Sequence, residues 1–108
     1  MSGSSGVYYM VFKVAQAVCK NGRDLVTGYF SATNAEEQEL IGVMIEVFGE
    51  VPTYNNKFYT DGKRILFKSV ELELLKENLN YISRELVVPI TFQANKHFTG
   101  NRDILSKL

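Results

Sequence analysis

The sequence predicts an α+β fold, a two-layer sandwich in which a mostly antiparallel sheet carries two helices on one face. Two observations predict it. Segments of alternating apolar residues and segments with helical spacing follow one another in the order ββαββαβ. Both helical segments are apolar along only one stripe, so a single sheet face is enough to bury them. Without its first strand this is the ferredoxin-like order βαββαβ, and we therefore expect a ferredoxin-like variant.

The first strand is expected at residues 7–18, and it is apolar on both of its faces. Side chains alternate along a strand, which places Met10 and Phe12 on one face and Tyr9 and Val11 on the other. Two helices on one side of the sheet cover only one of these sets. Leaving the second set in water gives up about 1.5–3 kcal/mol for each large side chain. We therefore expect a partner to cover the second sheet face.

The next two elements have clear boundary signals. An Asn-Gly dipeptide at 21–22 favours a two-residue hairpin turn, which predicts the second strand at 25–32. A helix is expected at 35–48, because Thr33 and Glu36 have the spacing of a capping box and apolar residues recur at helical spacing after them.

The second half of the chain repeats this pattern. A hairpin is expected at 53–69, with an Asp-Gly turn, and Ser69 is expected to cap a second helix at 70–85. A final strand is expected at 87–94. Pro89 favours an edge position for this strand, because proline lacks the N–H group that would pair with a neighbouring strand.

These elements predict a single domain at residues 7–95. We interpret residues 1–6, which read MSGSSG, as an expression leader or a disordered segment. Residues 96–108 are expected to form a C-terminal tail, in which a short helix is one alternative.

The sequence also bears on location. The single cysteine, Cys19, excludes an internal disulfide and fits a reducing compartment, so a cytoplasmic location is expected. The terminal Ser106-Lys107-Leu108 has the form of a peroxisomal address, which is the alternative if this is a native eukaryotic C-terminus. No apolar run approaches the roughly 20 residues of a membrane span, so no membrane partner is expected.

The charges are balanced in number but not in position. The chain has twelve acidic and twelve basic residues. The two expected helices hold eight of the acids and only two of the bases, which leaves most of the bases to strands, turns and tail. If both helices lie on one face, that face is acidic and the sheet side is basic, and such a separation can steer an anionic partner.

The residues that catalysis or metal binding would need are scarce. His97 is the single histidine, and we interpret it as a solvated loop residue and not as a catalytic base. One histidine and one cysteine cannot supply the usual ligand set of a zinc site. We therefore expect no enzymatic activity, no cofactor and no metal.

One family resemblance rests on two stretches. Residues 30–51 (FSATNAEEQELIGVMIEVFGEV) and 55–82 (NNKFYTDGKRILFKSVELELLKENLNYI) resemble the ββαββα portion of LAGLIDADG-type homing endonucleases. The first helix of that family, which ends in the metal-binding acid, has no counterpart here. The resemblance implies contact between the sheet and DNA, and it does not imply cleavage. We do not assign the chain to this family.

Our leading interpretation is a small non-enzymatic binding protein, such as a regulator, inhibitor or accessory factor, that acts through its sheet face or an edge strand. The expected partner is a second copy of the chain, in a homodimer, or another protein. The candidate partner-binding residues are Tyr9, Val11, Lys13 and Tyr29.

The alternative is a nucleic-acid-binding domain that uses the basic, aromatic-bearing side of the sheet. Sheets of this kind stack bases on aromatic side chains and hold phosphates with Lys and Arg. The candidate residues for this function are Lys13, Arg64, Lys68, Lys96 and Arg102.

Overall fold

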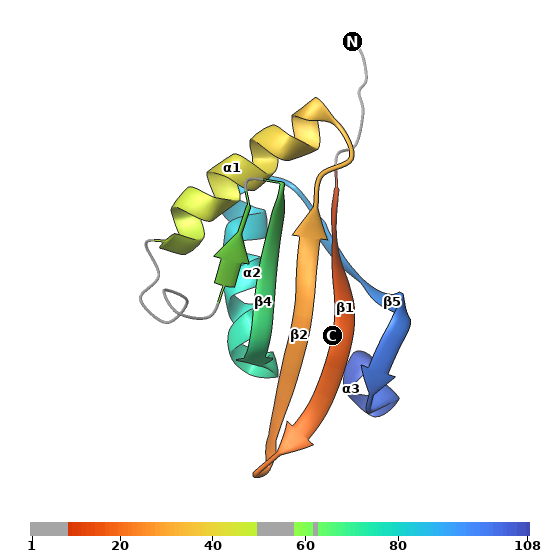
Figure 1. The fold of residues 1–108 in the computed structure, drawn as a ribbon. Helices are drawn as coiled ribbons and strands as arrows, with labels where there is room; N and C mark the ends of the chain where they lie inside the picture. The colour runs from red at the N-terminus through yellow and green to blue at the C-terminus, as the bar shows by residue number, and fades with distance from the viewer. Residues whose placement is uncertain (1–8, 50–57, 62) are drawn as a thin grey trace.

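The computed structural model describes residues 9–49, 58–61 and 63–108 (Figure 1). Over these residues the chain is an α+β fold with one mixed five-stranded sheet and three helices. The expected leader at 1–6 and the first two residues of the expected first strand lie outside the described residues. The elements are, in chain order, β1 (Met10–Lys20), β2 (Arg23–Ser31), α1 (Ala35–Gly49), β3 (Phe58–Thr60), β4 (Arg64–Glu71), α2 (Leu72–Leu86), β5 (Ile90–Gly100) and α3 (Arg102–Leu105).

The strand order differs from the ferredoxin-like expectation. The strands lie in the order β3-β4-β2-β1-β5, and neighbours are antiparallel except β1 and β5, which are parallel. A two-residue turn joins β1 to β2, and so short a turn places β1 directly beside β2. β5 therefore pairs with β1 and not with β2. The α+β class is confirmed, and the simple antiparallel ferredoxin pattern is not observed.

The turn between β1 and β2 has the predicted residues and geometry. The φ angles of Asn21 and Gly22 are 54° and 76°. A two-residue turn of the type that fits the twist of a hairpin needs positive φ at both positions, which Asn and Gly tolerate best. The predicted hairpin is therefore confirmed at this point.

A bulge in β1 changes which residues face the core. The pairing of β1 with β2 shifts between Val14 and Gln16. Because an extra residue in one strand reverses the alternation beyond it, Ala17 joins Phe12 on the buried face. Simple alternation puts Ala17 on the opposite face and Val18 on the buried face, so the bulge exchanges these two residues between the faces.

The core lies between one face of the sheet and the helices, and α2 runs behind the sheet in Figure 1. The ring of Phe12 meets the rings of Phe30 and Phe67 edge to face, with ring centres 5.1 and 5.8 Å apart. Such pairs are favourable because the positive edge of one ring meets the negative face of the other. The buried residues are Met10, Phe12, Val14, Ala17, Val26, Phe30, Ile41, Met44, Phe48, Ile65, Phe67, Val70, Leu72, Leu75, Leu79, Ile82, Val88 and Ile104.

The capping interactions of α1 are shifted by one residue from the prediction. The backbone N–H of Glu37 donates to Asn34 Oδ1 at 2.8 Å, so Asn34 and not Thr33 caps the helix. The Glu37 carboxylate reaches back and accepts from the hydroxyl and the backbone N–H of Thr33 at 2.6 and 2.8 Å. These two hydrogen bonds, the hydroxyl's first, hold the pKa of Glu37 below its ordinary value.

Ser69 does not cap the second helix as the sequence predicts. β4 continues to Glu71, and α2 begins at Leu72. The pairing of β2 with β4 shifts at this point, and Ser69 has a φ of 52° with its backbone N–H donating to Thr27 Oγ1 at 3.0 Å. Ser69 therefore lies in a bulge of β4 and not at the N-cap of α2. The predicted apolar stripe of α2 is nevertheless buried.

The end of α2 holds a valine in an unusual backbone conformation. Val87 follows the last helical residue with φ 54° and ψ 42°, and its side chain is 86% exposed. The left-handed conformation lets Val88 N–H donate to the carbonyl oxygen of Ser83 at 3.1 Å, which closes the helix end. Glycine is the usual residue here, because a Cβ atom is strained at positive φ.

The C-terminal residues are part of the folded unit. β5 extends to Gly100, and it is an edge strand, as Pro89 predicts. Residues 96–100, which are expected in a tail, therefore lie in the sheet. The short helix α3 follows, and Ile104 within it is buried in the core.

Gly28 provides a test of the packing between β1 and β2. A Cβ atom at Gly28 would lie 2.4 Å from a ring carbon of Phe12 and 2.6 Å from the carbonyl oxygen of Lys13. We expect Gly28→Ala to lower the free energy of unfolding by about 1–3 kcal/mol, because the core must shift to admit the methyl group. Denaturant unfolding measures this. Gly42→Ala is the control: with nothing within 4 Å of its Cβ, it should stabilise α1. Equal changes in the free energy of unfolding for the two variants would contradict the close packing of Phe12 against Gly28.

Val87 provides a second test. Val87→Gly should raise the free energy of unfolding by up to about 1 kcal/mol, because relief of strain at positive φ exceeds the entropy that glycine adds to the unfolded chain. The matched control is Val43→Gly, which places glycine inside α1 and should destabilise. A loss of stability in both variants, measured by thermal unfolding, would show that Val87 is not strained.

Candidate functional site

The candidate site is the sheet face that the helices do not cover, which we call the open face. A row of residues in register crosses all five strands on this face. It runs from Tyr59 on β3 to Leu66 on β4, Tyr29 on β2, Lys13 on β1 and Gln93 on β5. On each strand these residues alternate with residues of the buried face, which is why the row points away from the core.

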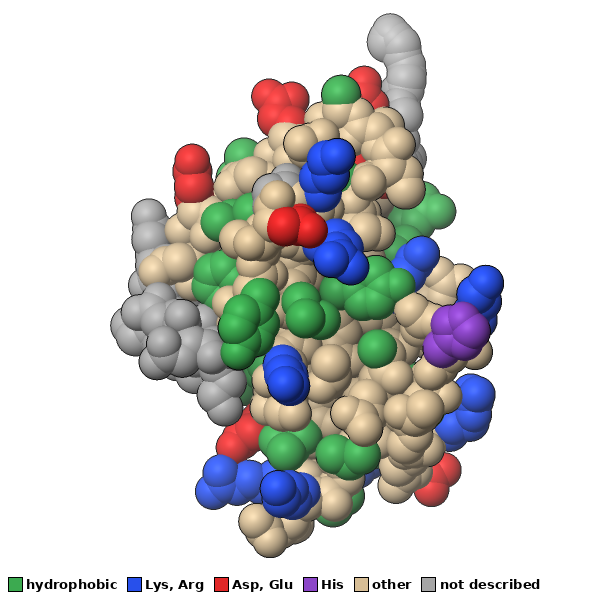
Figure 2. Space-filling model, viewed as in Figure 1, with side chains coloured by type: hydrophobic (Ala, Val, Ile, Leu, Met, Phe, Trp, Pro, Cys, Tyr) green, Lys and Arg blue, Asp and Glu red, His purple; other side chains and the backbone are tan. Residues whose placement is uncertain are grey.

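The middle of the open face is apolar and partly accessible. Figure 2 shows a band of hydrophobic side chains across the sheet, with Lys and Arg side chains around it. Tyr59 is 57% exposed and Leu66 is 37% exposed, whereas Tyr29 and Val11 are half-buried. Side chains this large are usually covered, so the band is a candidate contact surface.

Basic residues outnumber acidic residues on the open face. Among the described residues, the acids of this face are Asp61, which pairs with Arg64 at 3.4 Å, and Glu71, which pairs with Arg23 at 2.8 Å. Among the described residues, no ion pair is formed by the lysines of this surface. These lysines are Lys13 on β1, Lys20 at the end of β1, Lys68 on β4 and Lys96 on β5.

Tyr29 lies between two hollows of the open face, and the first of these lies beside Tyr59. It has a volume of about 210 Å³ and is lined by Tyr29, Tyr59, Thr60, Asp61, Arg64 and Leu66. The carboxylate of Asp61 accepts from the backbone N–H groups of Lys63 and Arg64, both at 3.0 Å. These hydrogen bonds, Lys63 first, hold the pKa of Asp61 below its ordinary value. The hollow therefore combines apolar walls with the ion pair of Asp61 and Arg64.

The second hollow lies on the other side of Tyr29. It has a volume of about 450 Å³ and is lined by Lys13, Tyr29, Gln93, Ala94, Asn95 and Lys96. The pairing of β1 with β5 is irregular between Ala94 and Thr99, and this irregular segment supplies Asn95 and Lys96. Asn95 Nδ2 donates to the hydroxyl of Tyr29 at 2.8 Å. This bond holds Tyr29 in place between the two hollows.

The structure brings some of the predicted site residues together and separates others. Lys13 and Tyr29 are direct neighbours, and Val11, Arg64 and Lys68 lie on the same open face. Lys96 lines the second hollow.

Two predicted residues lie outside the row of residues that crosses the open face. Tyr9 precedes β1 and is 55% exposed. Arg102 belongs to α3, where its guanidinium lies 5.3 Å from the ring centre of Phe98, so it is not in the row that crosses the open face.

Seven residues that line the two hollows beside Tyr29 were not predicted as site residues, among them Tyr59, Asp61 and Asn95. Tyr59 and Asp61 belong to the predicted second hairpin, and the alternation along that hairpin is a signal that could have found Tyr59. Asn95 falls beyond the predicted end of the last strand, and no local signal marks it.

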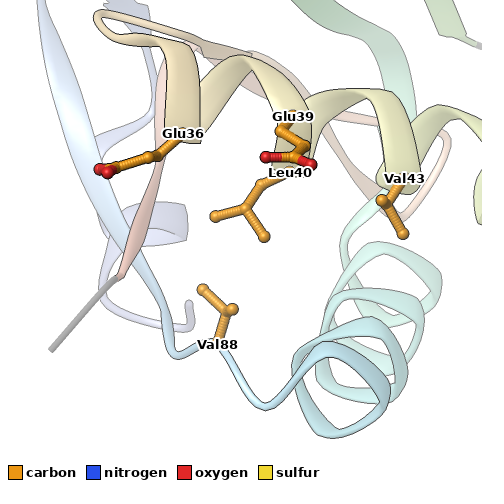
Figure 3. A pocket seen from close by; sticks show the side chains of 5 residues that line it. All are labelled: Glu36, Glu39, Leu40, Val43 and Val88. Atoms are coloured by element: carbon orange, nitrogen blue, oxygen red, sulfur yellow. The ribbon is translucent and has the colours of Figure 1, made fainter.

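A third hollow lies on the helix side of the molecule (Figure 3). It has a volume of about 360 Å³ and is lined by Glu36, Glu39, Leu40, Val43 and Val88. Leu40 and Val88 point toward each other across it, and the two glutamates stand at its rim. This hollow is acidic, in contrast to the open face.

The residues considered for catalysis do not line these hollows. His97 is exposed, and its backbone N–H donates to Asn95 Oδ1 at 2.9 Å. Cys19 is an exposed free thiol near the end of β1. Over residues 9–49, 58–61 and 63–108, no group of three or more His, Cys, Asp or Glu side chains could hold a metal ion.

Comparison with known proteins adds no relative: no family model, no curated protein and no solved structure matches the chain. In the part of the chain that the structure describes, no helix is both long enough and apolar enough to cross a membrane.

The hydrogen bonds of Asp61 predict a pH dependence. Because the pKa of Asp61 is lower in the folded than in the unfolded chain, its contribution to stability is present above about pH 4 and is lost as the pH falls through the folded-state pKa. Between pH 7 and pH 3 we expect the wild type to lose more stability than Asp61→Asn. Urea unfolding at both pH values measures this. Equal losses would show that the Asp61 carboxylate has no such role.

Proposed function

We propose that this protein is a small non-enzymatic binding protein, that it acts through the open face of its sheet, and that its ligand there is a nucleic acid. The observation that carries the proposal is the combination, on one face, of the exposed Tyr59 and the half-buried Tyr29 with lysines that have no ion-pair partner among the described residues. Phosphates are held by Lys and Arg, and bases stack on aromatic rings. A sheet face that offers both is suited to such a ligand.

The open face is less suited to the homodimer that the sequence first favours. In a two-fold dimer formed through this face, the basic surface of one copy, with Lys13 and Lys68, would face the same basic surface of the other. Like charges brought together in this way oppose association. The apolar band alone, from Tyr59 to Tyr29, would have to overcome this repulsion.

The fold supports the same choice of face. We interpret the architecture as a two-layer arrangement, a variant of the ferredoxin-like order in which β1 is inserted between β2 and β5. In such an arrangement all helices lie on one side, and the wide opposite side is available to a ligand.

The salt dependence of binding tests the proposal. A fluorescein-labelled oligonucleotide of mixed sequence should bind the protein, measured by anisotropy, and the affinity should fall steeply with salt as counterions are released. If three lysines each contact one phosphate of a single strand, the logarithm of the binding constant plotted against the logarithm of the salt concentration has a slope of about −2. Lys13→Gln and Lys68→Gln should each weaken binding several-fold and reduce this slope by about 0.7.

The matched control is Arg84→Gln on α2, which removes the same charge from the helix side. It should leave both affinity and slope unchanged. Sedimentation velocity without oligonucleotide is the second measurement. An absence of binding at low salt, together with a dimer that is indifferent to salt, would overturn the proposal in favour of self-association.

A further inference from the structure

We infer that the nucleic acid on the open face is single-stranded, with one unpaired base beside Tyr59 in the first hollow and the backbone phosphates beside Lys13 and Lys96 at the second hollow. This inference rests on the proposed function and specifies its ligand. It follows from the size and charge of the two hollows and from the residue between them.

The exposed ring of Tyr59 favours an unpaired base. In a duplex, both faces of each base are covered by the neighbouring base pairs, so an accessible tyrosine ring on a sheet has nothing to stack on. In a single strand the bases can turn outward onto such a ring. Tyr59 is 57% exposed and lies on the edge strand β3, where a base can approach it.

The first hollow offers a phosphate less than the second hollow does. Arg64 and Asp61 both line it and pair at 3.4 Å, and the Asp61 carboxylate also accepts from two backbone N–H groups, so a phosphate there would have to compete with Asp61 for the guanidinium. A base carries no charge, and its amino and ring N–H groups can donate to a carboxylate. The volume of about 210 Å³ is smaller than the pockets that hold drug-sized ligands, and it suits a single flat ring system.

The second hollow has the opposite character. Lys13 and Lys96 lie at its two sides, the described residues that line it include no acid, and Gln93 and Asn95 add amide groups that can donate hydrogen bonds to phosphate oxygens. Lysine ammonium groups in such a position hold a phosphate as point charges. A phosphate is therefore the part of the strand that fits this hollow.

Tyr29 sets the distance between the two hollows. Its side chain lines both of them, and the hydrogen bond from Asn95 Nδ2 at 2.8 Å anchors its hydroxyl. The two hollows are thus adjacent, so a base and a backbone phosphate of one short segment can occupy them together.

The first experiment compares four ligands at one salt concentration by anisotropy. These are a 12-nucleotide single strand, the same strand annealed to its complement, an abasic strand of equal length, and inorganic phosphate as competitor. We expect the single strand to bind at least ten-fold more tightly than the duplex or the abasic strand, because only the single strand offers unstacked bases.

The second experiment uses variants of Tyr59. Tyr59→Ala should weaken single-strand binding by about ten-fold or more without changing the slope with salt, because it removes stacking and no charge. Tyr59→Phe should restore most of the affinity. The matched control is Tyr81→Ala on α2, which removes a tyrosine of similar exposure from the helix side and should have no effect.

A spectroscopic readout keeps the inference testable if Tyr59→Ala is poorly folded. The chain contains no tryptophan, so its ultraviolet fluorescence comes from tyrosine. Binding of the single strand should quench this fluorescence more in the wild type than in Tyr59→Phe, and the abasic strand should quench it little. Equal quenching in the two proteins would show that no base stacks on Tyr59.

The outcomes separate this inference from the proposed function. Duplex binding as tight as single-strand binding, with Tyr59→Ala unaffected, would overturn the inference and leave nucleic-acid binding through the open face intact. Binding of neither form would overturn both. Competition by millimolar inorganic phosphate that matches competition by the single strand would show an anion site only, and would also overturn the inference.

Discussion

The open face depends on the position of β1 in the sheet. The turn at 21–22 places β1 beside β2, and β5 must then pair with the free edge of β1. The contact between Phe12 and Gly28 locks these two strands at one register, because no side chain larger than hydrogen fits beneath the ring. A one-residue slip would turn Phe12 outward and Lys13 into the core. The alignment of Lys13 with Tyr29, and so the two hollows, follows from packing on the opposite side of the sheet.

For a ligand at the open face, the separation of positive and negative charges between the two sides of the molecule matters more than the net charge of zero. The acids of α1 and α2 lie behind a layer of helices that is about 10–12 Å thick, and the screening length at physiological salt is about 8 Å. A ligand at the open face therefore responds mainly to the lysines near it and little to the acids behind the helices. The acidic hollow beside Leu40 and the basic hollow between Lys13 and Lys96 then act as independent surfaces, although they belong to one small domain.

The sequence predicted the features that depend on residues close together in the chain, and it did not predict the register between distant strands. The Asn-Gly turn, the stripe of α2 and the edge position of β5 each follow from residues close together in the chain, and the structure has all three. Two bulges were missed because they arise from pairing between distant strands, and they moved Ala17 to the core and took Ser69 from its expected cap. The site was only partly predicted for the same reason. Lys13 and Tyr29 belong to one hairpin, whereas Tyr59 and Asn95 reach them through strands remote in sequence.

The sequence raised the question of what covers the second face of β1, and the structure reduces the need for a permanent cover. Val11 and Val18 are half-buried within the sheet, and the long aliphatic stem of a lysine such as Lys13 can lie over apolar neighbours while its ammonium group stays in water. The same ammonium groups oppose the stacking of a second copy, as charged residues do on many exposed sheets. A face protected in this way is stable without a partner and can still exchange its water and counterions for a polyanion. Reversible binding, and not obligate assembly, is the behaviour that this arrangement favours.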